Sequence, residues 1–174
     1  MSIQELLTAV PFVSDRRRYQ GAGRTVDDFG CKAATGKDMK EIVEKLVRAE
    51  QEMAAEKGAF LLFAVFLRED APDVWDLIVA SPWVAEDKPG SLRYISDKVR
   101  SILDASELVK LSRIVLIEPD NPALAAFQQA IHVEHRIAEF KDSVFSGLRI
   151  KHAYLITSRQ DTNTEPSKPA THPK

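Results

Sequence analysis

The chain has 174 residues, of which 44% are hydrophobic and 29% are charged. A chain of this length and composition buries the core of one ordinary domain, which excludes a protein that is disordered throughout. Its 24 Lys and Arg residues nearly balance its 26 Asp and Glu residues, and the formal net charge of −2 excludes attraction of the whole molecule to nucleic acid or anionic lipid.

Residues 1–36 are predicted to form a short helix followed by a basic, glycine-containing arm. Ser2 and Glu5 have the Ser-x-x-Glu spacing of a capping box, which predicts a helix over residues 3–10 that ends at Pro11. Residues 14–36 show no apolar period and hold four of the seven glycines, a pattern typical of a long loop.

Residues 37–157 have the pattern of a single α/β domain. Apolar residues at helical spacing predict a helix between Asp38 and Gly58. Residues 59–67 are continuously apolar, as expected for a strand that is covered on both faces and lies in the middle of the sheet. A short polar turn leads to a predicted strand over residues 74–80, which favours an antiparallel hairpin.

The second half of this domain alternates between helices and strands before a final hairpin. We predict helices over residues 91–105 and 122–131, and strands over residues 113–118, 135–140 and 148–157. The polar segment 158–174 contains three prolines, which indicates a disordered tail.

This order predicts an α/β (α+β) fold in which helices pack on a mixed five-stranded sheet, with the elements running α-α-β-β-α-β-α-β-β. Two strand-helix-strand units favour parallel crossovers, and the two hairpins favour antiparallel pairs at the outside of the sheet. Ligands bind most often outside the carboxyl ends of parallel strands. We therefore predict a binding edge where the second and third strands end, formed by Trp83, Glu118 and Asp120.

Acidic residues near this edge allow two interpretations. Glu86, Glu118 and Asp120 offer oxygen ligands of the kind that Mg²⁺ prefers, which would make Mg²⁺ a cofactor. The alternative is a solvated acidic rim without a metal ion or another cofactor, in which Asp120 helps to cap the helix that follows.

Pro72-Asp73, or alternatively Asp76, followed by Glu86-Asp87-Lys88, resembles the Pro-Asp…Asp/Glu-x-Lys signature of restriction-type nucleases. The resemblance implies a metal-dependent phosphodiester hydrolase, in which Asp73 or Asp76 and Glu86 hold a divalent ion and Lys88 helps to activate water. Five residues of strand span about 17 Å, so Asp76 and Glu86 meet only if the chain folds back near Pro82.

Three histidines, His132, His135 and His152, allow either a zinc or nickel site or ordinary hydrogen-bonded packing.

The predicted arm contains three arginines and one tyrosine: Arg16, Arg17, Arg18 and Tyr19. The arginines can bind phosphate groups, and the tyrosine ring can stack on a base. The alternative for the arm is pairing with the protein's own acidic rim or with a second subunit.

No complete catalytic motif is present. Cys31 is the only cysteine in the chain, so no intrachain disulfide can form, and neither a leader-like start nor a long apolar run is seen. We therefore expect a cytoplasmic, non-catalytic interaction module that self-associates or binds a protein partner and does not associate with a membrane, and whose arm could also contact nucleic acid. The alternative is the metal-dependent hydrolase.

Overall fold

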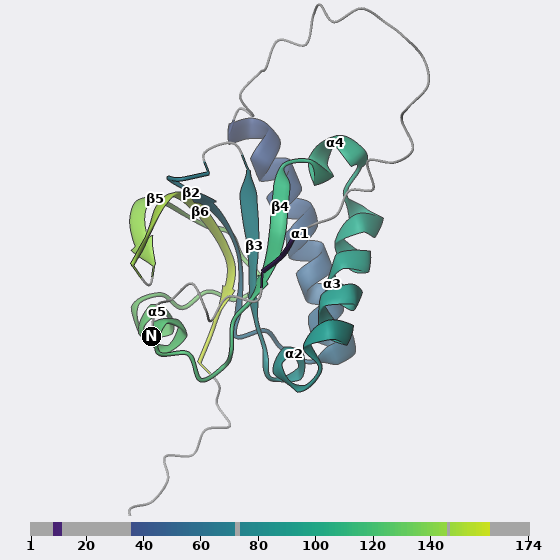
Figure 1. Ribbon diagram of the computed structural model, residues 1–174, viewed down its shortest axis with the longest axis vertical. Coiled ribbons are helices and arrows are strands. Elements are labelled where there is room, and N and C mark those ends of the chain that lie inside the picture. The colour runs from purple at the N-terminus through teal and green to yellow at the C-terminus, as the bar shows by residue number, and fades with distance from the viewer. Residues whose placement is uncertain (1–8, 12–35, 72–73, 146, 161–174) are drawn as a thin grey trace, which may run out of the picture.

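The computed structural model describes residues 9–11, 36–71, 74–145 and 147–160 (Figure 1). In chain order its elements are β1 (Ala9–Pro11), α1 (Gly36–Lys57), β2 (Leu62–Arg68), β3 (Trp75–Ala80), α2 (Pro82–Glu86), α3 (Lys88–Ile102), α4 (Ala105–Leu108), β4 (Leu111–Leu116), α5 (Pro122–Ala130), β5 (Ala138–Phe145) and β6 (Leu148–Ser158).

These strands form one mixed sheet in the order β1-β4-β3-β2-β6-β5. The pair β3 and β4 is parallel, and every other neighbouring pair is antiparallel. The predicted α/β fold and its five strands are confirmed. The hairpins β2-β3 and β5-β6 are also found as predicted, and β2 lies inside the sheet between β3 and β6.

The second predicted parallel crossover is wrong. Helix α5 leads from β4 to β5, but β5 lies at the far edge of the sheet and its direction is opposite to that of β4. The physical reason lies in β6, whose apolar residues from Ala153 to Ile156 are buried beside β2. Because β5 forms a hairpin with β6, it is placed at that edge with it.

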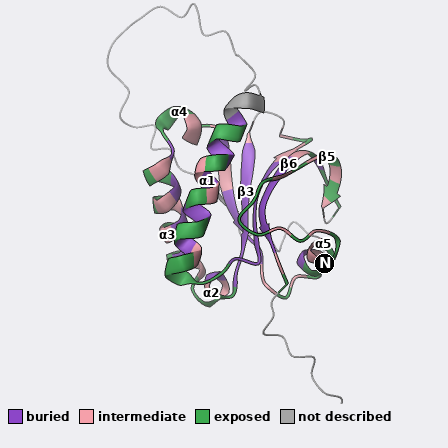
Figure 2. Ribbon diagram, turned by 180° about the vertical axis from the view of Figure 1, so that it is seen from behind, coloured by how far each residue is buried: buried purple, intermediate pink, exposed green. Residues whose placement is uncertain are grey.

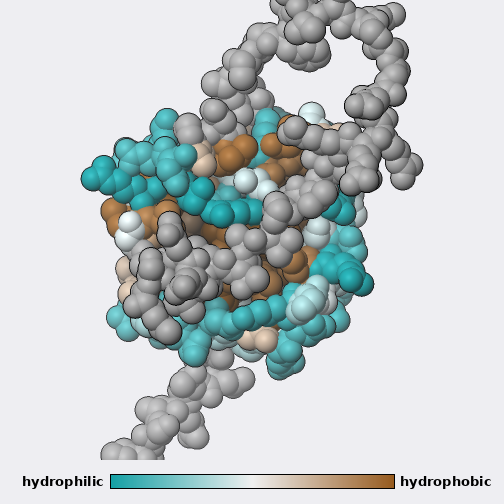
Figure 3. Space-filling model, viewed as in Figure 1, coloured by the Kyte–Doolittle hydropathy of each residue, from teal (hydrophilic) through white to brown (hydrophobic). Residues whose placement is uncertain are grey.

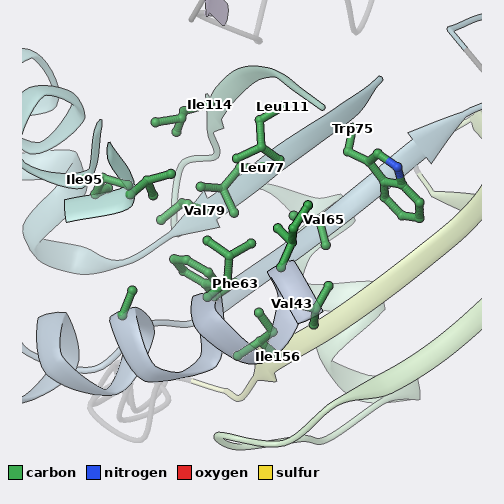
Figure 4. Close-up of a cluster of buried hydrophobic side chains, with 14 of the residues drawn as sticks. Val43, Phe63, Val65, Trp75, Leu77, Val79, Ile95, Leu111, Ile114 and Ile156 are labelled. Atoms are coloured by element: carbon green, nitrogen blue, oxygen red, sulfur yellow. The ribbon is translucent and has the colours of Figure 1, made fainter. Parts of the chain in front are cut away.

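Helices cover the two faces of the sheet unequally. Helices α1 and α3 lie side by side on one face, and α5 lies on the other face near the curled β5-β6 hairpin (Figures 1 and 2). The face under α1 and α3 buries alternate residues of the strands, such as Phe63, Val65, Leu77 and Val79 (Figure 4).

The opposite face has its own apolar cluster. It includes Leu62, Ala64 and Phe66 of β2 and Leu124 of α5. Since residues of β2 are buried on both faces, its sequence is continuously apolar rather than alternating. Hydrophobic side chains are also visible between hydrophilic ones in the space-filling view of Figure 3.

Helix boundaries in the middle of the chain differ from the prediction. Helix α3 begins at Lys88, because the Asp87 carboxylate accepts a hydrogen bond from the backbone N–H of Gly90 and caps the helix. It ends at Ile102, three residues before the predicted end. The separate helix α4 then starts with a capping box formed by Asp104 and Glu107.

Both ends of the chain also correct the prediction. Ala9–Pro11 pairs with β4 as a sixth strand, so the last residues of the predicted helix 3–10 are extended. The tail was predicted to begin at Ser158, but Ser158 is buried in β6 and the backbone N–H of Arg159 donates to the carbonyl of Leu61 at 3.0 Å. The rest of the predicted N-terminal helix, arm and tail lies outside the described residues.

In the described part of the chain, none of the helices combines the length and the apolar character that a membrane span requires.

Candidate functional site

The two chain segments that follow the parallel strands meet, as the sequence predicted. Val79 of β3 is paired with Leu116 of β4 at their carboxyl ends. Beyond that pair, the Lys88 ammonium at the start of α3 forms an ion pair with the Glu118 carboxylate in the loop after β4. The two segments therefore lie side by side, while binding at this edge by Trp83, Glu118 and Asp120 stays a prediction.

Trp83 lies on the helical side of this edge. Its ring packs edge-on against Phe60 and Tyr94, with centroid separations of 5.4 and 6.0 Å. Its indole N–H donates to the carbonyl of Gly58 at 3.0 Å. The sequence predicted an exposed indole, but Trp83 is half-buried because the segment after α1 supplies the Phe60 ring and the carbonyl of Gly58, and α3 supplies the Tyr94 ring.

A surface cavity of about 460 Å³ opens beside Trp83. Its lining residues come from the end of α1, from α2 and from the start of α3: Lys57, Trp83, Glu86, Asp87, Gly90, Ser91 and Tyr94. The Lys57 ammonium lies 5.4 Å from the centroid of the Tyr94 ring. The Asp87 carboxylate caps α3, and Glu86 is exposed and forms no ion pair with another described residue.

Tyr94 connects this cavity to a charged network between α1 and α3. Its hydroxyl donates to Glu56 at 2.6 Å, and the Lys98 ammonium lies 2.7 Å from the other oxygen of Glu56. Burial, assisted by the Glu56 carboxylate, raises the pKa of Tyr94 to about 12. The hydrogen bonds from Lys98 and Tyr94 lower the pKa of Glu56 below its usual value.

The predicted Mg²⁺ ligands do not come together. Glu118 is engaged with Lys88, and Asp120 is exposed in the loop before α5, whose cap is Asn121 rather than Asp120. Among the described residues, no three His, Cys, Asp or Glu side chains are placed to hold a metal ion. Glu86, Glu118 and Asp120 are thus not a group of metal ligands in the described part of the chain.

The residues of the nuclease-like pattern are also apart. Asp76 is the second residue of β3, whereas Glu86 follows beyond the other end of that strand, and the chain forms helix α2 after Pro82 instead of folding back as a strand. Lys88 contacts Glu118. Asp73 lies outside the described residues.

Asp76 instead belongs to an arginine cluster that the sequence did not predict. Its buried carboxylate oxygen Oδ2 accepts a hydrogen bond from Nη2 of Arg113 at 2.9 Å and lies 3.3 Å from Nε of Arg68. The register that pairs Asp76 with Arg113 follows an irregularity after Trp75. The sequence signal for this cluster was the presence of charged residues, such as Asp76 and Arg113, inside otherwise apolar strands. Only the pairing of the strands shows that these residues meet.

Two of the histidines, His135 and His152, have separate partners. Nδ1 of His135 lies 2.6 Å from Glu50, and Nε2 of His152 lies 2.9 Å from Glu139. The ring of His152 also packs against Trp75 and Tyr154. Within the described segments these histidines form no metal site, so hydrogen-bonded packing is the interpretation that the geometry favours.

The predicted binding residues Arg16, Arg17, Arg18 and Tyr19 lie outside the described part of the chain. Comparisons with protein-family models, with curated proteins and with solved structures found no match.

Proposed function

We propose that the protein is a non-catalytic interaction module, and that it binds a basic segment of a protein partner in the cavity beside Trp83. The observation that supports this proposal is the combination of two aromatic rings, Trp83 and Tyr94, with the carboxylates of Glu86 and Asp87 around one open cavity.

Such a lining suits a lysine or arginine side chain. An aromatic face attracts a cation through its quadrupole, and a nearby carboxylate adds direct charge attraction. The protein's own Lys57 and Lys98 already lie 5.4 and 6.0 Å from the centroid of the Tyr94 ring. Glu86 remains without a basic partner among the described residues, so its charge is available to an incoming side chain.

The chain itself carries a basic segment, Arg16-Arg17-Arg18-Tyr19. We therefore include a second copy of this chain among the protein partners, which makes self-association part of the proposal. Contact between this segment and nucleic acid remains a prediction, because the segment lies outside the described residues.

The test uses a fluorescent peptide with the sequence of residues 14–24, titrated into the full-length protein and followed by anisotropy. We expect saturable binding that weakens with added salt, and loss of binding when the arginines of the peptide are replaced by glutamate. Glu86→Lys should weaken binding about tenfold, since it replaces attraction by repulsion.

The matched control is Glu44→Lys, which makes the same charge change at an exposed position on α1. It should change the affinity less than twofold, because its carboxylate is not part of the cavity lining. Equal weakening by both substitutions would show that net charge, and not this cavity, controls binding. Absence of saturable binding would remove the arginine segment as a ligand, and the same result with other basic peptides would contradict the proposed function.

A further inference from the structure

Arg68 and Arg113 lie beside Asp76 near the start of β3, at the opposite end of this strand from Trp83. They are on the sheet face whose apolar cluster includes Leu124 of α5. Both approach a single oxygen of Asp76, whose side chain is 5% exposed. The two arginine side chains are 23% and 24% exposed. Three charged groups are thus held together in a mostly buried position, with two positive charges and one negative charge.

A fourth charged group, Asp70, lies at the exposed side of this cluster. Its Oδ1 is 3.3 Å from Nε of Arg68, but its side chain is 67% exposed. A carboxylate in that position remains hydrated and is screened by solvent, so it compensates the buried positive charge weakly.

Most hydrogen-bond donors of the two guanidinium groups have no acceptor among the residues that the structure describes. Each guanidinium carries five N–H donors. In the described part of the protein, one of these ten donors forms a hydrogen bond, namely the bond from Nη2 of Arg113 to Asp76. The Nε atoms of Arg68 and Arg113 are buried and form no hydrogen bond with a described residue, although Nε of Arg68 lies 3.3 Å from one carboxylate oxygen each of Asp70 and Asp76. Since buried polar groups are nearly always satisfied, these donors indicate an acceptor that the described residues do not provide.

A cavity of about 30 Å³ adjoins both arginines. Apart from Arg68, Asp76 and Arg113, its lining is apolar and consists of Phe66, Ile78, Val115, Ile117, Phe145, Leu148 and Ile150. The volume is close to that of one water molecule in the liquid, so only a group of a few atoms enters fully. Phe145 and Leu148 are half-buried and provide an apolar surface beside this space.

We propose that Arg68 and Arg113 bind the carboxylate of a small ligand whose apolar part rests against Phe145 and Leu148. A planar guanidinium matches a carboxylate through paired N–H to oxygen bonds, and apolar walls strengthen the attraction between the charges. A cation is disfavoured here because two guanidinium groups repel it. This site is independent of the Trp83 cavity, since the two share no lining residue.

The experiment follows the Nε–H signals of the arginines in the ¹⁵N-labelled wild-type protein by NMR. Sodium butyrate, sodium acetate and sodium phosphate are titrated separately at constant ionic strength, with sodium chloride as the reference. We expect the signals of Arg68 and Arg113 to shift saturably with butyrate, and butyrate to bind several-fold more tightly than acetate because its alkyl chain contacts the apolar wall.

The signal of Arg93, which is exposed on α3, is the internal control and should not shift. Two outcomes would overturn the proposal: no saturable shift at Arg68 and Arg113 with either carboxylate, or equal shifts at Arg93. Saturable binding of phosphate without binding of either carboxylate would overturn the assigned ligand class. These readouts use the wild-type chain, so they do not depend on how well a variant folds.

Two substitutions extend the test. Asp76→Asn removes the internal carboxylate that competes for Arg113 while keeping an oxygen acceptor, so butyrate should bind about tenfold more tightly. Arg113→Lys replaces the planar fork by a compact ammonium and should weaken binding by tenfold or more. Weaker binding in Asp76→Asn, in a variant whose amide spectrum shows that it is folded, would contradict competition between Asp76 and the ligand.

Discussion

The carboxylate of Glu50, in the middle of α1, lies 2.6 Å from Nδ1 of His135, a residue 85 positions later in the chain. The Glu50 side chain is fully buried, and its other oxygen accepts a hydrogen bond from the hydroxyl of Thr157 at 2.9 Å. His135 has a φ of 51°, an uncommon value for a residue with a side chain. The contact therefore ties the loop before β5 to α1 and helps to hold a backbone conformation that costs free energy.

Replacement of His135 by alanine should lower the free energy of unfolding by about 2 kcal/mol, because a buried carboxylate then keeps only the Thr157 hydroxyl among its described partners. Urea unfolding followed by circular dichroism measures the difference. The neighbouring substitution Glu134→Ala breaks a more exposed ion pair with Arg159 and should cost less than about 1 kcal/mol. Similar losses for the two variants would mean that the Glu50 contact contributes little.

The pKa of Tyr94 predicts a loss of stability at high pH. Burial, and then the hydrogen bond to Glu56, raises this pKa from 10.0 to about 12, so the folded protein keeps the phenol proton over a range in which the unfolded chain loses it. The contribution is fully present below pH 10 and is lost as the pH rises from 10 to 12. Absorbance at 295 nm during an alkaline titration should show a late tyrosine step that becomes smaller in Tyr94→Phe; it does not vanish, because burial also raises the pKa of Tyr154.

The same variant should change an acidic titration. The Glu56 carboxylate, whose pKa is lowered by hydrogen bonds from Lys98 and Tyr94, loses one donor in Tyr94→Phe. Its pKa should rise toward the ordinary value of 4.5 while remaining below it, because Lys98 is still bound. Side-chain carboxyl signals in a ¹³C NMR titration measure this shift, and an unchanged pKa would show that the hydroxyl does not stabilise the charged form.

Leu124 anchors α5 to the sheet. It is the one buried residue of this helix, and its side chain is fully covered within the second apolar cluster. Leu124→Ala should lower the free energy of unfolding by about 2 to 5 kcal/mol, the usual cost of a cavity in a core. The exposed replacement Gln129→Ala on the same helix should stay within about 0.5 kcal/mol in the same urea experiment. A loss below about 1 kcal/mol for Leu124→Ala would show that α5 is not anchored through this residue.

Gly58 ends α1 with a φ of 113°, a conformation that L-residues with a side chain rarely adopt. A methyl group there would lie 3.6 Å from Cδ1 of Trp83, an ordinary contact, so the cost of Gly58→Ala is conformational and should be about 1 to 3 kcal/mol. Thermal unfolding of this variant and of its exposed neighbour Lys57→Ala makes the comparison. An unchanged melting temperature in Gly58→Ala would contradict the required backbone conformation.

The main elements were predictable because local periodicity defines them. The helix expected between Asp38 and Gly58 is found at Gly36–Lys57, and the apolar run over residues 59–67 forms the inner strand β2. The strand expected over residues 135–140 is instead Ala138–Phe145. The positive φ of His135 depends on its distant contact with Glu50, and no local pattern reveals such a contact.

The sequence predicted which two chain segments meet at the proposed binding edge, but not how Trp83 is oriented there. Parallel pairing of β3 and β4 brings Lys88 next to Glu118, as expected. The orientation of Trp83 depends on two other segments, since Gly58 and Phe60 lie between α1 and β2 and Tyr94 lies in α3. The association of Asp76 with Arg68 and Arg113 requires two strand registers at once. Carboxylates that are neighbours in sequence were therefore a poor guide to which charges meet.

By itself, the order of apolar and polar residues determined that this protein is a mixed α/β domain, because burial of alternate or continuous apolar residues selects helices and strands locally. Only the tertiary structure decided where β5 lies, which partners surround Trp83 and why Asp76 contacts arginines. Those outcomes depend on contacts between residues far apart in the chain. Which of these contacts form depends on the packing and hydrogen bonding of the whole fold, and not on the local sequence.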